Sequence, residues 1–211
     1  MKITKLEHSG IVLEKSGQCL VFDPVEIETQ LPELRDVVGL IITHKHGDHL
    51  QPAQIQKIVA ANPTVRVLTT SDATSEVPHD FSVRNGETLK VGDFELQFFG
   101  QDHAVIVPGK IPCENLGVVV DGQVVNPGDS FDFPDGITEP EVLLVPLASP
   151  WHKIVDSMEY IQTHRPKRVI PVHDAVLSDF GRQINNNWLR QACFEVGSEL
   201  VALEAGQSLE I

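Results

Sequence analysis

Residues of metal-binding types are concentrated in the segment THKHGDH, residues 43–49. The segment holds His44, His46, Asp48 and His49. In extended backbone alternate side chains point to the same side, so the imidazoles of His44 and His46 can converge on one ion. Gly47 permits a sharp turn, after which Asp48 and His49 are presented together and can serve a second ion nearby. A solvated polar loop is the alternative interpretation, but three histidines and an aspartate in this order favour a metal site.

A segment this short cannot complete two coordination spheres. Zinc takes about four ligands, and a catalytic site leaves one position to water. Three further candidates each follow an apolar, β-like run: His103 after residues 94–100, Asp129 after 123–126 and His173 after 167–172. A surface histidine, a turn aspartate and a helix cap are the alternatives for each residue taken singly. Because all three lie at predicted strand ends, we expect them to gather at one edge of the sheets.

The elements that must position these residues begin with a β-rich first third. Short apolar runs predict strands at 2–7, 10–15, 19–23 and 64–70. The nearly continuous apolar run 37–43, which leads into the histidine segment, suits a strand buried on both faces. Residues 53–62 show helical spacing of Ile55, Ile58 and Val59 and stop before Pro63. The histidine segment is therefore expected in a loop between a buried strand and a helix.

Strands and helices alternate in the rest of the chain. Apolar runs predict strands at 94–100, 115–121, 123–129, 141–147 and 167–173. Asp121-Gly122 between two valine-rich runs is a signal for a two-residue hairpin. Helical patterns cover 153–165 and about 179–194, and short strands finish the chain. Two mixed sheets, each covered by helices on its outer face, satisfy this order and give an α+β fold.

The composition limits the classes of function. The chain has 211 residues, 41% of them hydrophobic, and a formal net charge of −14. Its length and the lack of a linker predict a single domain over residues 1–211. With no basic stripe, nucleic acid is not an expected partner. No apolar run approaches the ~20 residues of a membrane helix and the start lacks a secretory signal, so we expect a cytoplasmic protein without a membrane partner.

The three cysteines, Cys19, Cys113 and Cys193, are far apart and form no C-x-x-C pair. Neither a disulfide framework nor a thiolate zinc site is expected from them. None has an evident base partner in the sequence, so we assign none of them a nucleophilic role.

On these residues the sequence resembles the metallo-β-lactamase superfamily. THKHGDH matches that family's H-x-H-x-D-H motif, and His103, Asp129 and His173 match its later His, Asp and His in order. CLVFDP resembles the family's early strand ending in Asp, and NPGDS its bridging-aspartate motif, so the resemblance covers nearly the whole chain. The motif is highly specific for the fold and the metal site. It is poorly specific for the substrate.

The resemblance implies a four-layer αββα sandwich with a dinuclear site between the sheets. By motif position, His44, His46 and His103 hold one metal, Asp48, His49 and His173 hold the other, and Asp129 bridges them. Imidazoles and carboxylates suit two zinc ions, with manganese or iron also possible. Such a centre supplies hydroxide near neutral pH and polarises a carbonyl or phosphoryl oxygen. Asp48 is expected to orient the water and to carry a proton toward the leaving group.

Further residues of the expected pocket follow from the same resemblance. The sequence looks most like the small lactonase-like group that includes ascorbate-phosphate lactonase. The segment EHSG, residues 7–10, resembles the G-H-[SA] motif of that group. At that position His8 is expected to line the pocket, with a packed or surface histidine as the alternative. Asp23 is expected to orient a ligand histidine, with a turn as the alternative. Trp151 and His152 follow the strand 141–147 and are expected near the substrate, with packing over a helix start as the alternative.

We expect a metal-dependent hydrolase acting on a small-molecule ester or lactone. A metal-dependent phosphodiesterase or nuclease is an alternative, which the charge of −14 disfavours because acidic protein repels polyphosphate. Another is a redox protein with a di-iron version of the same ligands, although this chain lacks room for the flavin domain that usually accompanies such a site. The last alternative is a non-enzymatic metal-binding module of the same fold. A panel of lactone, phosphodiester and thioester substrates separates the first two.

Overall fold

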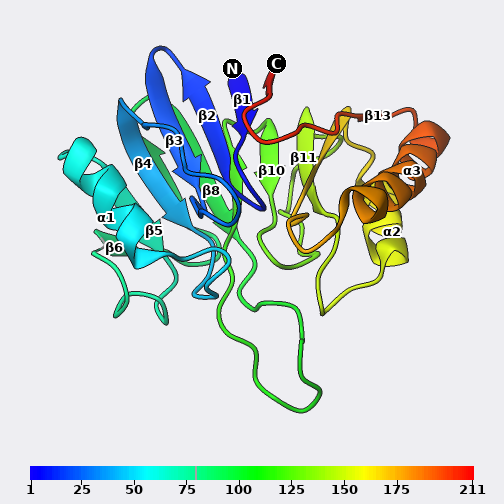
Figure 1. The fold of residues 1–211 in the computed structure, drawn as a ribbon, viewed down its shortest axis with the longest axis horizontal. Helices are drawn as coiled ribbons and strands as arrows, with labels where there is room; N and C mark the ends of the chain where they lie inside the picture. Colours follow the sequence, from blue (N-terminus) through cyan, green and yellow to red (C-terminus); the bar gives the residue numbers. More distant parts are fainter. Residues whose placement is uncertain (79) are drawn as a thin grey trace.

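The computed structural model of the chain describes residues 1–78 and 80–211. In this part of the chain, two sheets stack face to face and helices cover both outer faces (Figure 1). Sheet A has the order β14 (Ser208–Glu210), β1 (Lys2–Lys5), β2 (Ile11–Lys15), β3 (Gln18–Phe22), β4 (Val37–Ile42), β5 (Arg66–Thr69) and β6 (Phe81–Ser82). Sheet B has the order β13 (Glu199–Leu200), β12 (Arg168–Val172), β11 (Val142–Pro146), β10 (Val124–Asn126), β9 (Gly117–Val120), β8 (Phe94–Phe99) and β7 (Thr88–Val91).

Three helices complete the four layers in the described residues. Helix α1 (Pro52–Ala61) lies against sheet A, whereas α2 (Ile154–His164) and α3 (Asp179–Val196) lie side by side against sheet B (Figure 1). Pro52 starts α1 at a position where its missing N–H costs nothing. The Ser178 side chain caps the start of α3, and Gly197 with φ 78° ends it. The predicted αββα sandwich is confirmed.

The side chains of the central strands alternate between two apolar layers. Leu20 and Phe22 of β3 enter the core between the sheets, while Val21 packs toward α1. In sheet B, Leu144 of β11 faces the same central core, and Leu143 faces α2 and α3. Because strands are buried on both faces, they read as continuous apolar runs rather than as alternating patterns.

Strand directions bring several loops to one edge of the sandwich. Strands β3, β4 and β5 are parallel, and so are β10, β11 and β12. Strand β9 is antiparallel to both β8 and β10, so β8 runs in the same direction as β10. The segments that follow β3, β4, β8, β10, β11 and β12 therefore leave their sheets at the same edge. Strand β2 is antiparallel to β3, so the β1–β2 turn lies there as well.

The expected strands and helices all form, and their ends lie at most three residues from the predicted ones. Asp121 and Gly122 both have positive φ, and the Gln123 N–H donates to the Val120 carbonyl at 2.9 Å, which closes the predicted hairpin. Strands β6 and β7 are not predicted, because both are short and only half of their residues are apolar. Within the described residues, no helix combines the length and the apolar character that crossing a membrane requires.

Candidate metal centre

The seven predicted ligands meet at the edge where these loops converge. Three overlapping groups of ligand atoms, each within 4.8 Å of one another, contain all seven: His44, His46 and His103; His44, His49 and Asp129; and His8, Asp48, His49 and His173. His44 to His49 follow β4, His103 follows β8, Asp129 follows β10 and His173 follows β12. The arrangement joins strand ends from both sheets. His8, from the β1–β2 turn, is the one member that the motif does not contain.

Hydrogen bonds hold the Nδ1 side of four imidazoles. His49 Nδ1 lies 2.8 Å from the Asp23 carboxylate, and His44 Nδ1 lies 3.1 Å from the Thr43 hydroxyl. The Thr43 hydroxyl donates to Asp23, so it accepts from His44. The Nδ1 atoms of His103 and His173 bond to backbone carbonyls, those of Ala104 and Ala148 respectively. These acceptors keep a proton on each Nδ1 and direct each Nε2 toward the centre.

The Nε2 atoms that face inward have no hydrogen-bond partner at three positions, His44, His49 and His103, although all three are buried. The Asp129 carboxylate lies 3.2 Å from His49 Nε2, 3.3 Å from His103 Nε2 and 3.1 Å from His173 Nε2. Atoms that share a tetrahedral zinc ion at about 2.0–2.1 Å are about 3.3 Å apart. Imidazole lone pairs facing a buried carboxylate at these separations need positive charge between them. The residues present therefore fit divalent metal ions.

The same residues dominate the electrostatics of the centre. Burial opposes the ionised form of Asp129, but His49, His103 and His173 outweigh it and hold the pKa of this carboxyl well below its usual range. Burial disfavours protonation of His49, yet Asp129 and Asp23 raise its pKa well above the ordinary value. His173 shows the same balance, and its pKa rises to about 9. These shifts mark places where the carboxylates attract positive charge.

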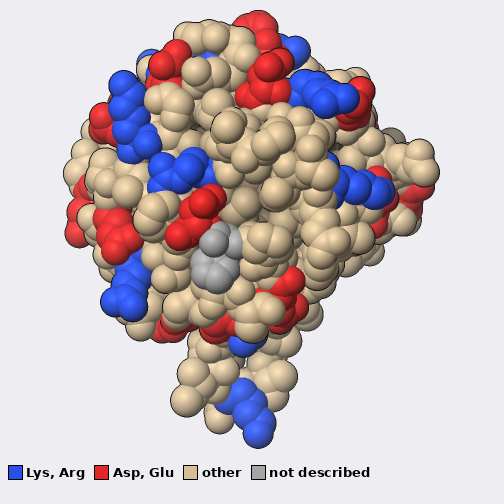
Figure 2. Space-filling model, turned by 90° about the vertical axis from the view of Figure 1, so that its left-hand side faces the viewer, with Lys and Arg blue, Asp and Glu red and all other residues tan. Residues whose placement is uncertain are grey.

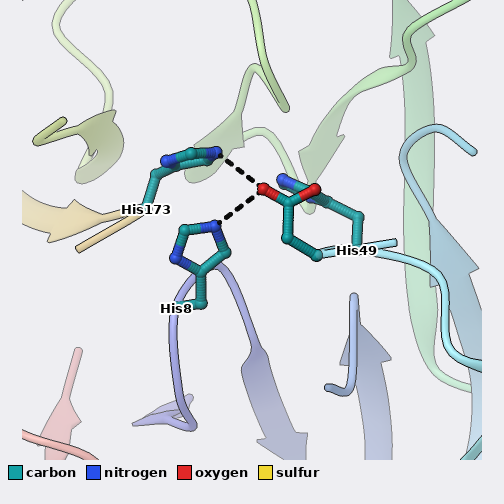
Figure 3. A group of neighbouring side chains, drawn as sticks. His8, His49 and His173 are labelled. Carbon is teal, nitrogen blue, oxygen red and sulfur yellow. Dashed lines mark hydrogen bonds and ion pairs between the residues drawn. The ribbon is translucent and has the colours of Figure 1, made fainter. Parts of the chain in front are cut away.

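His8 contacts the carboxylate that the motif assigns to catalysis. Its Nδ1 accepts the backbone N–H of Ala175 at 3.2 Å, so the ring proton is on Nε2, which donates to Asp48 Oδ2 at 3.3 Å. His173 Nε2 lies 3.5 Å from the same oxygen (dashed lines in Figure 3). The rings of His8 and His173 are 3.9 Å apart, and His8 is 1% exposed. His8 is thus placed to hold Asp48 as a donor, rather than to offer a lone pair.

Trp151 and His152 take different positions. The Trp151 Nε1–H donates to Asp129 Oδ2 at 3.0 Å, and its ring meets His103 edge to face. This contact orients the carboxylate that three imidazoles surround. His152 bonds to Ser149 through Nδ1 at 2.8 Å and packs beside Trp151, outside the three groups of ligand atoms. The structure thus brings Trp151, and not His152, to the centre.

Asp23 is fully enclosed beneath the centre. It is 1% exposed and accepts from the Thr43 N–H at 2.8 Å, from the Thr43 hydroxyl at 2.7 Å and from His49. Asp23, His8 and His173 all have positive φ, at 41°, 55° and 57°. Non-glycine residues in this region are strained by roughly 1–3 kcal/mol, and such strain concentrates at functional sites.

Two contacts at the centre are not visible in the sequence. Thr43 links Asp23, His44 and His49, but a threonine at the end of a strand gives no signal of such a role. Cys113 Sγ lies 3.6 Å from His46 Nε2, and burial raises the pKa of this thiol to about 11. Cys113 comes from a loop 67 positions away from His46, so only the fold brings them together.

This fold and this edge define an αββα sandwich protein with a histidine-rich metal centre. The chain matches the Beta-lactamase superfamily domain over residues 2–173. It belongs to that superfamily.

Relatives and solved structures agree with this membership. Protein Rv0786c of Mycobacterium tuberculosis is 26% identical over 190 residues, covering 87% of this chain and 89% of that protein. A UPF0173 metal-dependent hydrolase of Aeropyrum pernix is 25% identical over 205 residues, covering 82% of this chain and 81% of that one. The structure of a metallo hydrolase from Ignicoccus hospitalis superposes with a TM-score of 0.75 at 20% identity, covering 100% of this chain and 98% of that one.

The same fold also occurs in CmlA, a diiron β-hydroxylase from Streptomyces venezuelae. Its TM-score is 0.76 at 16% identity, and the match covers 100% of this chain and 54% of that one. The comparisons confirm the superfamily and the fold that the sequence predicts. They support the class of a metal-dependent hydrolase.

Proposed function

We propose that this chain hydrolyses a small-molecule ester or lactone at a dinuclear metal centre, with zinc as the first choice and manganese or iron as alternatives. His44, His46 and His103 would hold one ion, Asp48, His49 and His173 the other, and Asp129 both. The observation that carries the proposal is the set of buried Nε2 atoms without hydrogen-bond partners around Asp129. Bound ions of this kind supply hydroxide near neutral pH and polarise the substrate oxygen.

The two carboxylates of the centre differ in their access to a substrate. The Asp129 side chain is 4% exposed and is enclosed by imidazoles and Trp151. The Asp48 side chain is 44% exposed, although His8 and His173 hold its Oδ2. Burial opposes ionisation of Asp48, but these two histidines keep its pKa well below the usual range. Asp48 is therefore the ionised carboxylate within reach of a substrate, and its position is the reason why we assign to it the transfer of a proton from the attacking water to the leaving alkoxide.

His8 and Trp151 act in this proposal as positioning residues. Each donates one N–H to one carboxylate, His8 to Asp48 and Trp151 to Asp129. A carboxylate held in this way keeps its remaining lone pairs in a fixed direction, which improves a metal site as well as proton transfer.

The metal content of the purified protein is the first test. We expect about two equivalents of zinc, manganese or iron by elemental mass spectrometry, with at least one lost in His46→Ala. The matched control is His164→Ala, which removes a histidine that stacks on Phe133 at 3.6 Å on the far helix layer. Protein that holds no metal and takes none up on incubation would remove the basis of the proposal.

Turnover separates the proposed reaction from its alternatives. A panel of lactones, esters, thioesters and phosphodiesters, run with the metal found, should show hydrolysis of lactones or esters before phosphodiesters. Asp48→Asn should lower kcat about 10²–10⁴-fold while KM changes much less. Asp135→Asn, an exposed aspartate in a turn, is the control. Unchanged kcat in Asp48→Asn would contradict the role of this carboxylate. An iron-specific visible spectrum in a protein that hydrolyses no member of the panel would instead favour redox chemistry.

A further inference from the structure

An apolar loop projects from the edge that carries the metal centre. Residues 104–113, here called the arm, connect β8 to β9 and extend below both sheets (Figure 1). In the space-filling view a narrow, mostly uncharged projection leaves the base of the molecule (Figure 2). Four of its large apolar side chains are exposed: Val105 by 56%, Ile106 by 41%, Val107 by 53% and Ile111 by 95%. Lys110 is the single charged residue in this segment.

Both ends of the arm are fixed to the centre. The N–H of Ala104 donates to the Asp129 carbonyl, and the N–H of His103 donates to the Cys113 carbonyl, both at 2.9 Å. The Cys113 Sγ contacts His46. The arm therefore starts at one candidate ligand and returns to another, so its position is tied to that of the imidazoles.

The tip of the arm is a tight turn. The Lys110 N–H donates to the Val107 carbonyl at 3.1 Å, with Pro108 and Gly109 between them. Gly109 has φ 76°, which a turn with proline before glycine requires. Because proline fixes φ, the arm loses less conformational freedom on closing over a ligand than a flexible loop does.

A pocket of about 200 Å³ lies between the arm and the centre. It is lined by His46 and His103 together with Ala104, Val105, Ile106, Val107, Lys110, Ile111, Pro112 and Cys113. Whole small-molecule sites measure about 300–1,000 Å³, so this pocket suits one part of a ligand. Two of its walls are imidazoles of the ligand groups, His46 and His103, and most of the other lining residues are apolar.

We propose that this pocket binds an apolar alkyl or acyl chain of the substrate, with the scissile bond at the metal centre. The inference rests on the proposed function and names its substrate class, an ester or lactone with a hydrocarbon chain. Continuity of the pocket with His46 and His103 selects a substrate as its occupant. A membrane surface is disfavoured, because interfacial segments need a cluster of basic residues, whereas the arm has one and the chain carries −14.

Chain-length dependence of binding tests the inference. The probes are straight-chain alkyl hydroxamates of two to eight carbons, which chelate metal through one end, titrated into the metal-loaded protein by calorimetry. We expect affinity to rise about twofold to fourfold per methylene until the pocket is full. The double variant Val105→Thr/Val107→Thr replaces one methyl of each side chain by a hydroxyl and keeps its shape. Affinity in this variant should rise much less with each methylene of the probe. Val155→Thr, an exposed valine on α2, is the control and should keep the full rise.

The outcomes for the arm and for the proposed function are distinct. A steep rise of affinity with chain length in the wild type that flattens only in the double variant supports the arm as the subsite. If no ester is hydrolysed by the same protein, that result overturns the proposed reaction and leaves the subsite in place. A flat series, no binding of any hydroxamate, or an unchanged slope in the double variant overturns the subsite, even if esters are hydrolysed. A double variant that alters vesicle binding or oligomeric state but not the slope overturns it as well.

Discussion

The metal centre and the arm lie next to each other but are built in opposite ways. Most imidazoles and carboxylates of the centre are buried, such as His44 and His49 at 0% exposure, and both of these rings are held by a further hydrogen bond. The arm consists of apolar side chains in solvent, with Ile111 at 95%. A buried polar network tolerates little change, since each lost partner leaves a desolvated group. Substitutions in an exposed loop cost little stability. The residues proposed for the reaction therefore lie where few substitutions are tolerated, and those proposed for substrate selection lie where many are tolerated.

Among the substitutions considered, Asp129→Asn should have the largest effect on stability and metal content. It replaces the carboxylate that His49, His103 and His173 face with a neutral amide. Removing one charge from a buried network costs about 3–5 kcal/mol, so we expect a large drop in the urea stability of the metal-free protein and the loss of at least one metal ion. Asp132→Asn, on the same loop, is the control and should retain its metal. Two tightly held ions in Asp129→Asn would be inconsistent with a central role of this carboxylate.

The stability of the metal-free protein should depend on pH in the neutral to alkaline range. Burial opposes protonation of His173, but Asp129 and Asp48 raise its pKa to about 9, above the ordinary 6.5. A raised histidine pKa stabilises the fold fully below pH 6.5, and this contribution is lost as the pH rises through 9. His49 is shifted in the same direction.

We therefore expect the unfolding free energy of the metal-free protein to fall by roughly 2–4 kcal/mol between pH 6.5 and 9, measured by urea titration. In the metal-loaded protein the ligand imidazoles are already deprotonated, so the same window should show little change. A metal-free stability that rises with pH in this window would contradict the arrangement of charges.

Asp23→Asn should weaken metal binding without removing a ligand. The carboxylate accepts from His49 Nδ1 at 2.8 Å, and its loss frees that ring to turn or to change tautomer. A hydrogen bond to the other ring nitrogen of a ligand histidine contributes about 10–100-fold to metal affinity. We expect Asp23→Asn to lower the affinity by about this factor, measured by competition with a chelator. Asp36→Asn is a matched control, because Asp36 also has positive φ, at 55°, and asparagine accepts that conformation. Equal affinities of the two variants would remove the role given to Asp23.

Trp151→Phe should have a smaller effect on the same affinity. It removes one N–H donor to Asp129 and keeps most of the ring, so we expect roughly a threefold to tenfold loss. Trp151 and Trp188 are the two tryptophans of the chain, so fluorescence provides a second measurement. Emission should change on metal addition in Trp188→Phe and not in Trp151→Phe. A metal response that survives in Trp151→Phe would place this ring away from the ions.

Ile111→Ser should have the smallest effect on stability. The side chain is 95% exposed, so the unfolding free energy should change by less than about 0.5 kcal/mol and the metal content not at all. Binding of long-chain hydroxamates should nevertheless weaken, since Ile111 lines the pocket of the arm. A large loss of stability or metal would show that the arm and the centre are one cooperative unit, which would end the contrast between them.

Much of the fold follows from local patterns in the sequence. Apolar runs such as VVGLIIT are long enough and bounded clearly enough to indicate buried strands, and Asp121-Gly122 indicates its hairpin. Strands β6 and β7 are not predicted, because two and four residues are too few to show an apolar run or a clear alternation. The pairing of β14 with β1 joins opposite ends of the chain, and no local pattern encodes such a contact.

The candidate centre is predictable to a different extent for each residue. His44, His46, Asp48 and His49 are adjacent in sequence, and the positions of His103, Asp129 and His173 follow from strand ends. The contacts of His8 and Trp151 do not, because their partners lie 40 and 22 positions away and depend on how the loops fold back. His152 bonds to Ser149 and packs beside Trp151, and its expected place near the substrate stays a prediction.

The residue types that can bind metal can be read from the amino-acid sequence alone, and so can the strands that precede them and the acidic character of the chain. These properties are local, since they depend on side-chain chemistry and on backbone periodicity over a few residues. Three other features come from the folded chain: the ring nitrogen that each histidine turns to the centre, the donor that holds each carboxylate, and the position of the arm. Those features depend on the distances and angles between segments far apart in the chain, and the stacking of two sheets sets them.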